Sequence, residues 1–188
     1  MNLTNAEKKE LLTIARSSIA SGVKGARNQN PSPSSDTLQI PCGAFVTLKL
    51  HGELRGCIGY IEPRVPLYKT IGDVARKAAF EDPRFLPLLE SEFNEIEIEI
   101  SVMSPLQEIS DPEEIIVGTH GLVVDAGYTR GLLLPQVATE YGWNRDTFLM
   151  HTCKKAGLPG DAWQKKNVTL FIFTSAVFSE SELEHHHP

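Results

Sequence analysis

The chain has 188 residues, of which 41% are hydrophobic and 22% are charged, and its formal net charge is −6 at pH 7. This length suits one domain with room for two lobes around a shared core, and the composition is ordinary for a soluble globular protein. An acidic balance gives no electrostatic reason to expect nucleic-acid binding, and no apolar run approaches the roughly 18–20 residues that span a bilayer. We therefore expect neither a nucleic-acid partner nor a membrane segment.

The termini and the cysteines point to an intracellular protein. The start, MNLTNAEKKE, lacks the apolar core of a signal peptide, and three cysteines at wide spacing favour reduced thiols over a disulfide framework. We expect a cytoplasmic location. The chain contains no CxxC, HExxH, GxxxxGK[ST] or GxGxxG motif, so the sequence predicts no metal and no cofactor. The end, LEHHHP, is typical of an expression-tag remnant, so we exclude residues 183–188 and predict one domain over residues 1–182.

The first predicted element is a helix. Thr4 and Glu7 form a capping-box pattern, and Gly22 or Gly25 can end the helix. Between them, apolar residues recur at helical spacing: Leu11, Leu12, Ala15 and Ile19. Residues 26–42 are rich in Asn, Pro and Ser and show no periodicity, so we expect a long surface loop that is either mobile or a cover over something.

A β-hairpin is predicted over residues 43–61, with the three-residue turn His51-Gly52-Glu53. This register places a set of apolar pairs on one face, which we expect to be the core face: Leu50 with Leu54, Leu48 with Gly56, and Val46 with Ile58. On the other face it places Lys49 opposite Arg55 and Thr47 opposite Cys57.

A helix is predicted from Pro66 to Phe80, followed by a half-buried strand over residues 95–103. The inward positions of the helix are Leu67, Ile71, Val74, Ala75 and Ala78. In the strand, Ile96, Ile98, Ile100 and Val102 share one face, and Glu95, Glu97, Glu99 and Ser101 share the other.

The remaining elements are a second hairpin, with strands 121–124 and 131–134, a short helix over residues 135–142, a helix from Asn144 to Lys155 and a final strand over residues 168–178. Hairpins mixed with helices, without strict βαβ alternation, predict an α+β fold on a largely antiparallel sheet with flanking helices.

Six segments resemble those of a known family in the same order. They are FVTLKLHGELRGCIGY (45–60), AAFEDPRFLPL (78–88), IEISVMSPL (98–106), GTHGLVV (118–124), GLLLPQVATEYGW (131–143) and CKKAGLPGDAW (153–163). Together they resemble the AMMECR-type domain family, called in prokaryotes AmmeMemoRadiSam system protein A. The resemblance implies an α+β fold in two unequal lobes sharing one compact domain, and a functional link to a Memo-like protein and a radical-SAM protein. It supplies no reaction. The family's hallmark RGCIG, Arg55 to Gly59, is intact, and Tyr60 stands where many relatives carry Thr.

The hallmark segment contains the main candidate site. Lys49 opposite Arg55 would be an unfavourable like-charge pair, so we expect an anion there. One interpretation is that the carboxylates of Glu95, Glu97 and Glu99 supply it. The other is that the cations await an anionic ligand or partner.

A catalytic interpretation centres on Cys57. Fixed positive charge lowers the pKa of a nearby thiol, and the thiolate is the nucleophile. Gly56 and Gly59 would let a substrate approach closely, and His120 would serve as a base if the fold brings it near. Otherwise His120 is a hydrogen-bonded loop residue. Trp143 is a packing residue or a binding platform.

The loop after the helix offers one further pair. We expect Arg84 to bond nearby carbonyls or Asp82 and so fix this loop; alternatively, Asp82 caps the next turn.

Two functions follow. The first is a non-catalytic binding or accessory module that works with the Memo-like and radical-SAM partners. The alternative is a cysteine-dependent enzyme that acts on an anionic small molecule or peptide through Cys57. The predicted binding face centres on Arg55 and Cys57, in a groove flanked by residues 26–42. A solvated Arg55 would make Arg55→Ala cost under about 1 kcal/mol in folding.

Overall fold

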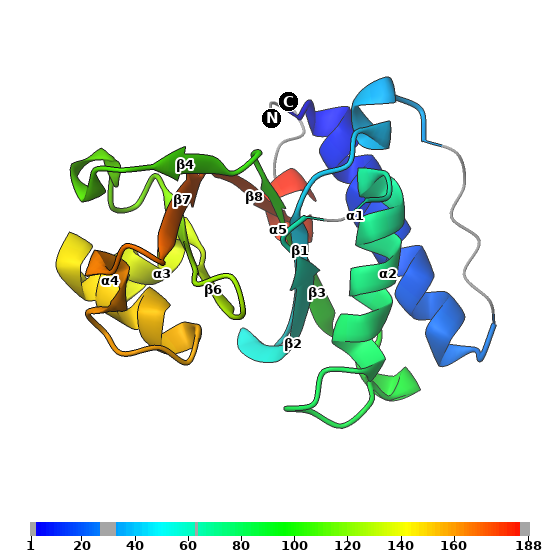
Figure 1. Ribbon diagram of the computed structural model, residues 1–188. Coiled ribbons are helices and arrows are strands. Elements are labelled where there is room, and N and C mark those ends of the chain that lie inside the picture. Colours follow the sequence, from blue (N-terminus) through cyan, green and yellow to red (C-terminus); the bar gives the residue numbers. More distant parts are fainter. Residues whose placement is uncertain (1–2, 27–32, 63, 185–188) are drawn as a thin grey trace. The chain divides into compact units, whose positions relative to one another are not determined.

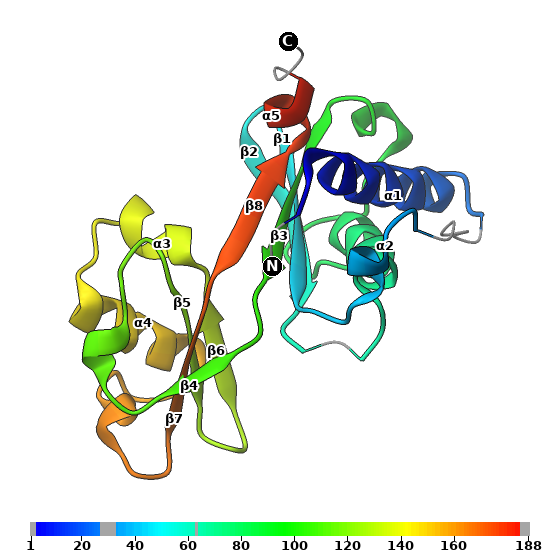
Figure 2. The same cartoon turned by 90° about the horizontal axis from the view of Figure 1, so that it is seen from above.

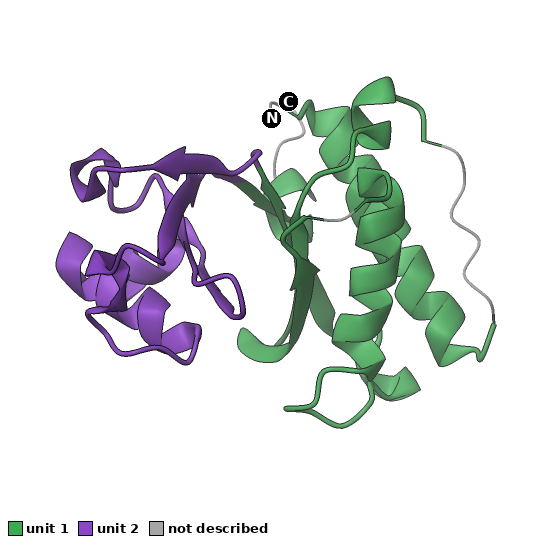
Figure 3. Cartoon of the chain, in the orientation of Figure 1, with its two compact units in different colours: residues 1–103, 176–188 green, residues 104–175 purple. Residues whose placement is uncertain are grey.

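The computed structural model describes residues 3–26, 33–62 and 64–184. The chain forms two compact units, shown in Figure 3: unit 1 comprises residues 1–103 and 176–188, and unit 2 comprises residues 104–175. Helices and two four-stranded sheets are present, and the described strand pairings are antiparallel. The predicted α+β class with two unequal lobes is therefore confirmed, with the strands divided between two sheets.

Unit 1 is a sheet covered by helices, with strand order β2-β1-β3-β8. Figures 1 and 2 show α1 and α2 side by side on one face of this sheet. Its elements are α1 (Asn5–Val23), the 3-10 helix η1 (Asp36–Gln39), β1 (Ala44–Leu50), β2 (Glu53–Tyr60), α2 (Leu67–Phe80), the 3-10 helix η2 (Glu90–Glu92), β3 (Ile96–Met103), β8 (Ser175–Ser179) and α5 (Glu180–Glu184).

The first helix begins as its sequence predicts. Thr4 Oγ1 accepts a hydrogen bond from the Glu7 main-chain nitrogen at 3.3 Å, and Glu7 Oε2 accepts one from the Thr4 nitrogen at 2.8 Å. This is the predicted capping box. The helix ends at Val23, and Gly25 follows with φ 65°, a left-handed conformation that glycine adopts without strain.

The core of unit 1 lies between the helices and the sheet. All the predicted inward residues of α2 are buried, and so are Ile96, Ile98, Ile100 and Val102 of β3. They pack with alternate residues of β1 and with one face of α1. The apolar residues that alternate along the strands and those that recur at helical spacing therefore share one core. Leu183, which we excluded with the tag remnant, is also buried in this core.

The β1–β2 hairpin has a tighter turn than its sequence predicts. Leu50 pairs with Glu53, so the turn has two residues, His51 and Gly52, with φ of 52° and 84°. A register shift between Leu48 and Lys49 then leaves Arg55 as the extra residue of a β-bulge. The predicted pairs at Leu48, Val46 and Thr47 are confirmed, but the predicted pairs Leu50–Leu54 and Lys49–Arg55 are wrong.

Unit 2 contains the second sheet, with strand order β4-β7-β5-β6. Its core includes Phe148, Leu149 and Cys153 of α4, which pack with residues of the sheet. Its elements are β4 (Gln107–Ile109), the 3-10 helix η3 (Pro112–Glu114), β5 (Gly121–Asp125), β6 (Arg130–Leu133), α3 (Pro135–Glu140), α4 (Arg145–Lys155), the 3-10 helix η4 (Ala162–Gln164) and β7 (Thr169–Phe173).

Two other predicted segments differ from the structure. The single final strand over residues 168–178 is two strands, β7 and β8, which belong to different sheets. The predicted loop 26–42 contains η1, whose Leu38 is buried, while residues 27–32 of that loop lie outside the described residues.

Among the described helices, none has both the length and the apolar character that a membrane span requires.

Candidate functional site

The hallmark segment RGCIG lies on β2, an edge strand of the unit 1 sheet. An edge strand has main-chain groups without a neighbouring strand, and these groups need other partners. At Cys57 the partners come from the loop after α2. The Cys57 nitrogen donates to Asp82 Oδ2 at 2.9 Å, and the Cys57 carbonyl accepts from Arg84 Nη2 at 3.3 Å. The loop thereby closes the sheet edge at Cys57.

Asp82 and Arg84 form the ion pair that makes this closure possible. Arg84 Nε and Nη2 donate to the two carboxylate oxygens of Asp82 at 3.0 and 2.7 Å. The Asp82 side chain is only 2% exposed. The hydrogen bond from Arg84 holds the pKa of the Asp82 carboxyl well below its ordinary value, against the opposing effect of burial. The expectation that Arg84 bonds nearby carbonyls or Asp82 is confirmed, because it bonds both. Asp82 also accepts from the Arg84 main-chain nitrogen at 3.1 Å, as the alternative of a turn cap predicts.

Arg55 faces a different partner from the one that the sequence suggests. Its Nε and Nη2 donate to the Glu92 carboxylate at 2.8 and 2.9 Å, and its Nη1 and Nη2 donate to the carbonyls of Leu86 and Pro87 at 3.0 and 3.4 Å. The hydrogen bond to Glu92 raises the pKa of Arg55. Because the Arg55 side chain is only 14% exposed, the premise of a solvated surface charge is wrong.

Lys49 meets the carboxylate row of β3. Its Nζ lies 2.8 Å from Glu99 Oε2, and Glu97 is the residue of β3 directly opposite Lys49 in the strand pairing. Of the two interpretations of the cation pair, the carboxylate row therefore accounts for Lys49, and Glu92 accounts for Arg55.

The Cys57 side chain lies opposite Thr47, as predicted. It is half-buried, and its Sγ accepts a hydrogen bond from Thr47 Oγ1 at 3.3 Å. The arrangement holds the thiol on the sheet face that also carries Lys49 and Thr47.

The two glycines of the segment allow close packing inside the protein. A Cβ at Gly56 would lie 2.1 Å from the carbonyl oxygen of Ala78 in α2, and a Cβ at Gly59 would lie 2.2 Å from the ring of Phe45. The space that a side chain would need is thus filled by α2 and by β1. A role of these glycines in substrate approach stays a prediction.

Next to this segment, Tyr60, Asp73 and Lys77 form a polar cluster that the sequence did not predict. Tyr60 Oη donates to Asp73 Oδ2 at 2.6 Å and accepts from Lys77 Nζ at 2.5 Å. The hydrogen bond to Tyr60 contributes most to raising the pKa of Lys77. Asp73 and Lys77 are four residues apart on α2, a spacing that indicates one helix face. Only the fold places Tyr60 between them.

The remaining candidates belong to unit 2. His120 lies in the turn before β5, and its Nδ1 accepts from the Ile116 nitrogen at 3.2 Å. Trp143 is stacked against Tyr141 and His151, with ring centroids 5.0 and 3.9 Å away, and packs on the unit 2 core. His120 belongs to unit 2 and Cys57 to unit 1, and each unit is described by itself. The pairing of His120 with Cys57 therefore stays a prediction.

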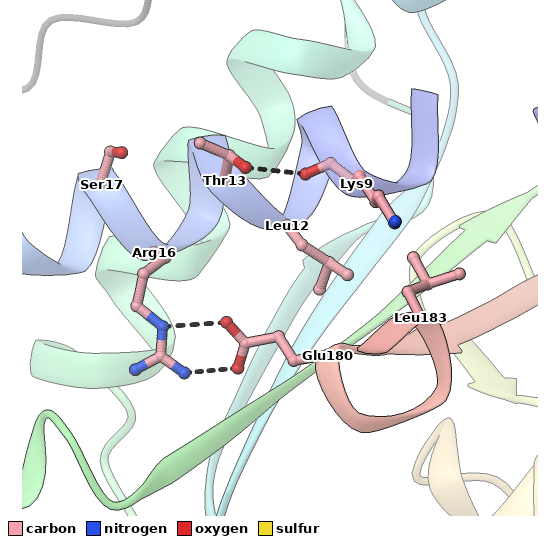
Figure 4. A pocket seen from close by; sticks show the side chains of 7 residues that line it. All are labelled: Lys9, Leu12, Thr13, Arg16, Ser17, Glu180 and Leu183. Carbon is pink, nitrogen blue, oxygen red and sulfur yellow. Dashed lines mark hydrogen bonds and ion pairs between the residues drawn. The ribbon is translucent and has the colours of Figure 1, made fainter. Parts of the chain in front are cut away.

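Unit 1 also has a pocket of about 460 Å³ between α1 and α5, shown in Figure 4. Its apolar lining comes from Leu12 and Leu183. Its polar lining includes Arg16 and Glu180, which form a two-bond ion pair. Because Arg16 also donates to two main-chain carbonyls, this pair mainly ties α5 to the rest of unit 1. Within the described part of the chain, no group of three or more His, Cys, Asp or Glu side chains could hold a metal ion.

Comparison with known proteins gives one consistent family. The family model AMMECR1 matches residues 12–178. A protein of Methanothermobacter thermautotrophicus is 42% identical over 185 residues, covering 95% of this chain and 96% of that one. A protein of Aquifex aeolicus is 39% identical, covering 93% of each chain. The crystal structure of an uncharacterized protein from Pyrococcus horikoshii matches with a TM-score of 0.84 and 38% identity, over 90% of this chain and 89% of that one.

Proposed function

The chain belongs to the AMMECR1 family, and we propose that it is a cytoplasmic binding or accessory component that works with a Memo-like and a radical-SAM protein. The link to these two partners rests on the resemblance of its six motifs to AmmeMemoRadiSam system protein A. The cytoplasmic location is supported by three cysteines that are all free thiols.

The observation that carries the proposal is that the polar groups of RGCIG form hydrogen bonds within the protein. Arg55 donates to Glu92 and to two carbonyls, and the Cys57 main chain is bonded to Asp82 and Arg84. Groups held in this way position a surface with little freedom. Such an arrangement suits recognition of a partner, because a preorganised surface loses little conformational entropy on binding.

The alternative, a cysteine-dependent enzyme acting through Cys57, receives less support. An activated thiol needs a neighbouring positive charge that is not already neutralised. Arg55 is paired with Glu92, Lys49 with Glu99 and Arg84 with Asp82. A nucleophilic role for Cys57 would therefore require a base such as His120 from unit 2 or a charge brought by the substrate.

Co-purification from the native cell tests the proposal. We expect wild-type protein, recovered under mild salt, to bring down the Memo-like protein, the radical-SAM protein or both. The Cys57→Ser variant should recover the same partners, because a binding component does not need the thiol. Recovery of neither partner by the wild type would remove the support for the proposal. Loss of recovery in Cys57→Ser, with unchanged folding, would favour a role for the thiol.

A further inference from the structure

The segment that Arg55 holds in place exposes two large apolar side chains. Leu86 is 84% exposed and Leu89 is 63% exposed, while Leu88 between them is buried. Figure 1 shows this part of the chain as a loop beyond the C-terminal end of α2. A single exposed leucine is ordinary, but two within four residues of one short loop suggest a contact surface.

The loop is firmly anchored on both sides of the exposed leucines. Arg55 binds the carbonyls of Leu86 and Pro87, and the Leu88 nitrogen donates to the Ala79 carbonyl at 2.8 Å. The Leu89 nitrogen donates to Glu92 Oε2 at 2.8 Å, and this carboxylate also binds Arg55. A largely buried arginine thus fixes the main chain of a loop in which the side chains of Leu86 and Leu89 are exposed. Rigid apolar groups of this kind bind at low entropic cost.

The charges beside the leucines are acidic. Glu81 and Glu90 flank the loop and are exposed, and neither forms an ion pair among the described residues. The cations that contact this part of the chain are themselves paired, Arg55 with Glu92 and Arg84 with Asp82. An incoming surface therefore meets two exposed leucines between uncompensated negative charges.

We propose that residues 85–89, which we call the leucine loop, dock into a partner protein that has an apolar pocket rimmed by Lys and Arg. The proposal rests on the proposed function as a binding component and names its contact surface. Because Leu86 protrudes, the partner surface must be concave at that point. Because Glu81 and Glu90 are uncompensated, the rim must be basic.

Other occupants fit the charges less well. The acidic flanks are repelled by the anionic lipids of a membrane surface. A second copy of this chain carries the same acidic flanks and the same net charge of −6. A basic partner protein satisfies both the leucines and the carboxylates.

Site-specific photo-crosslinking tests this docking. Leu86 is replaced by the photoreactive p-benzoylphenylalanine in the full chain, expressed in the cell that contains the Memo-like and radical-SAM proteins. The matched control places the same group at Ile116, which is 56% exposed in unit 2. We expect a crosslink from position 86, but not from position 116, to one protein at a peptide with apolar residues flanked by Lys or Arg.

Variants with unchanged melting temperature then measure the contributions of the leucines and the charge. With the purified crosslinked protein, Leu89→Ala should weaken binding by about tenfold or more, as for a buried interface anchor. Glu90→Lys should weaken binding and reduce its salt dependence, whereas Glu114→Lys, an exposed carboxylate in unit 2, should change neither.

The outcomes separate this proposal from the proposed function. A crosslink to a basic protein other than the two named partners, with neither of those partners co-purifying, supports the docking and overturns the proposed function. Continued co-purification with no crosslink from position 86 overturns the docking alone, and absence of both overturns both proposals. A crosslink to a second copy, a crosslinked peptide without basic residues, or binding to phosphatidylcholine–phosphatidylserine vesicles that Leu86→Ala abolishes also overturns the docking.

Discussion

Arg55 and Glu92 are joined by two hydrogen bonds, of 2.8 and 2.9 Å, between the edge strand β2 and the 3-10 helix η2. The β-bulge of the first hairpin makes this contact possible, because it leaves Arg55 without a direct partner on β1. The ion pair is largely removed from water, and two carbonyls complete the donor set of the guanidinium. Arg55 therefore stabilises the fold as well as the leucine loop.

Replacement of Arg55 should destabilise the protein strongly. Arg55→Ala leaves the Glu92 carboxylate and two carbonyls without their donor, so we expect the free energy of unfolding to fall by roughly 2–3 kcal/mol. Arg55→Lys should recover only part of this loss, because an ammonium cannot make the two-bond contact. Urea unfolding followed by circular dichroism measures both variants.

Lys49→Ala is the matched control for Arg55→Ala. Its ion pair with Glu99 is more exposed, so its removal should cost under about 1 kcal/mol. Equal losses for the two variants would contradict the structural role assigned to Arg55.

The Asp82 carboxylate should make stability depend on pH. Its pKa is lower in the folded protein than in the unfolded chain, mainly because Arg84 donates to it. Its contribution is therefore complete above the unfolded pKa of about 3.9 and is lost as the pH falls toward the folded pKa. Asp82→Asn should lower the free energy of unfolding by roughly 2 kcal/mol at neutral pH, and the difference from wild type should shrink below about pH 4.

Urea unfolding at several pH values checks this dependence. Asp146→Asn, at an exposed carboxylate in the first turn of α4, provides the control and should show a small effect at every pH. A difference between wild type and Asp82→Asn that stays constant down to about pH 3 would mean that the Asp82 charge does not matter.

Gly56 should tolerate no side chain. The Cβ of Gly56→Ala would meet the Ala78 carbonyl oxygen at 2.1 Å, and because this atom belongs to the main chain of α2, the strand or the helix must shift. We expect a loss of roughly 3 kcal/mol in the free energy of unfolding. Gly160→Ala, whose Cβ meets only the flexible side chain of Met150, should cost much less in the same urea titration. Wild-type stability of Gly56→Ala would contradict the close approach of β2 and α2.

The sequence predicted the parts of this fold that depend on local periodicity. The apolar alternation of β3 and the helical spacing of α2 both identified buried faces correctly. The hairpin register failed at its turn because His51 adopts a positive φ, which is uncommon for a residue other than glycine. With His51 and Gly52 both left-handed, two residues complete the turn, and the bulge at Arg55 absorbs the extra residue.

The candidate site was only partly predictable for a different reason. The DPRF motif indicated that Arg84 and Asp82 contact one another, since they are two residues apart. The contacts of this pair with Cys57, and of Arg55 with Glu92, join positions 25 to 37 residues apart. Such contacts depend on how β2 packs against the loop after α2, and a single sequence carries no periodic signal for that packing.

The three thiols should differ in reactivity. Burial raises the pKa of Cys42 to about 11 and also raises the pKa of Cys153, whose side chain is inaccessible. At about pH 8 only about one part in a thousand of Cys42 is thiolate, so alkylation there should be slow. Cys57 is half-buried, and we expect it to react first.

Iodoacetamide labelling of the folded protein, with mass spectrometry of each cysteine peptide, measures these rates. Cys57 in the Cys42→Ala, Cys153→Ala double variant can be compared with a short unfolded peptide that contains the same cysteine. A binding component requires no activation, so Cys57 should react no faster than the peptide at any pH. Faster alkylation of Cys57 than of the peptide near neutral pH would instead favour the cysteine-enzyme alternative. It would mean that the thiolate is stabilised even though the nearby cations are paired with carboxylates.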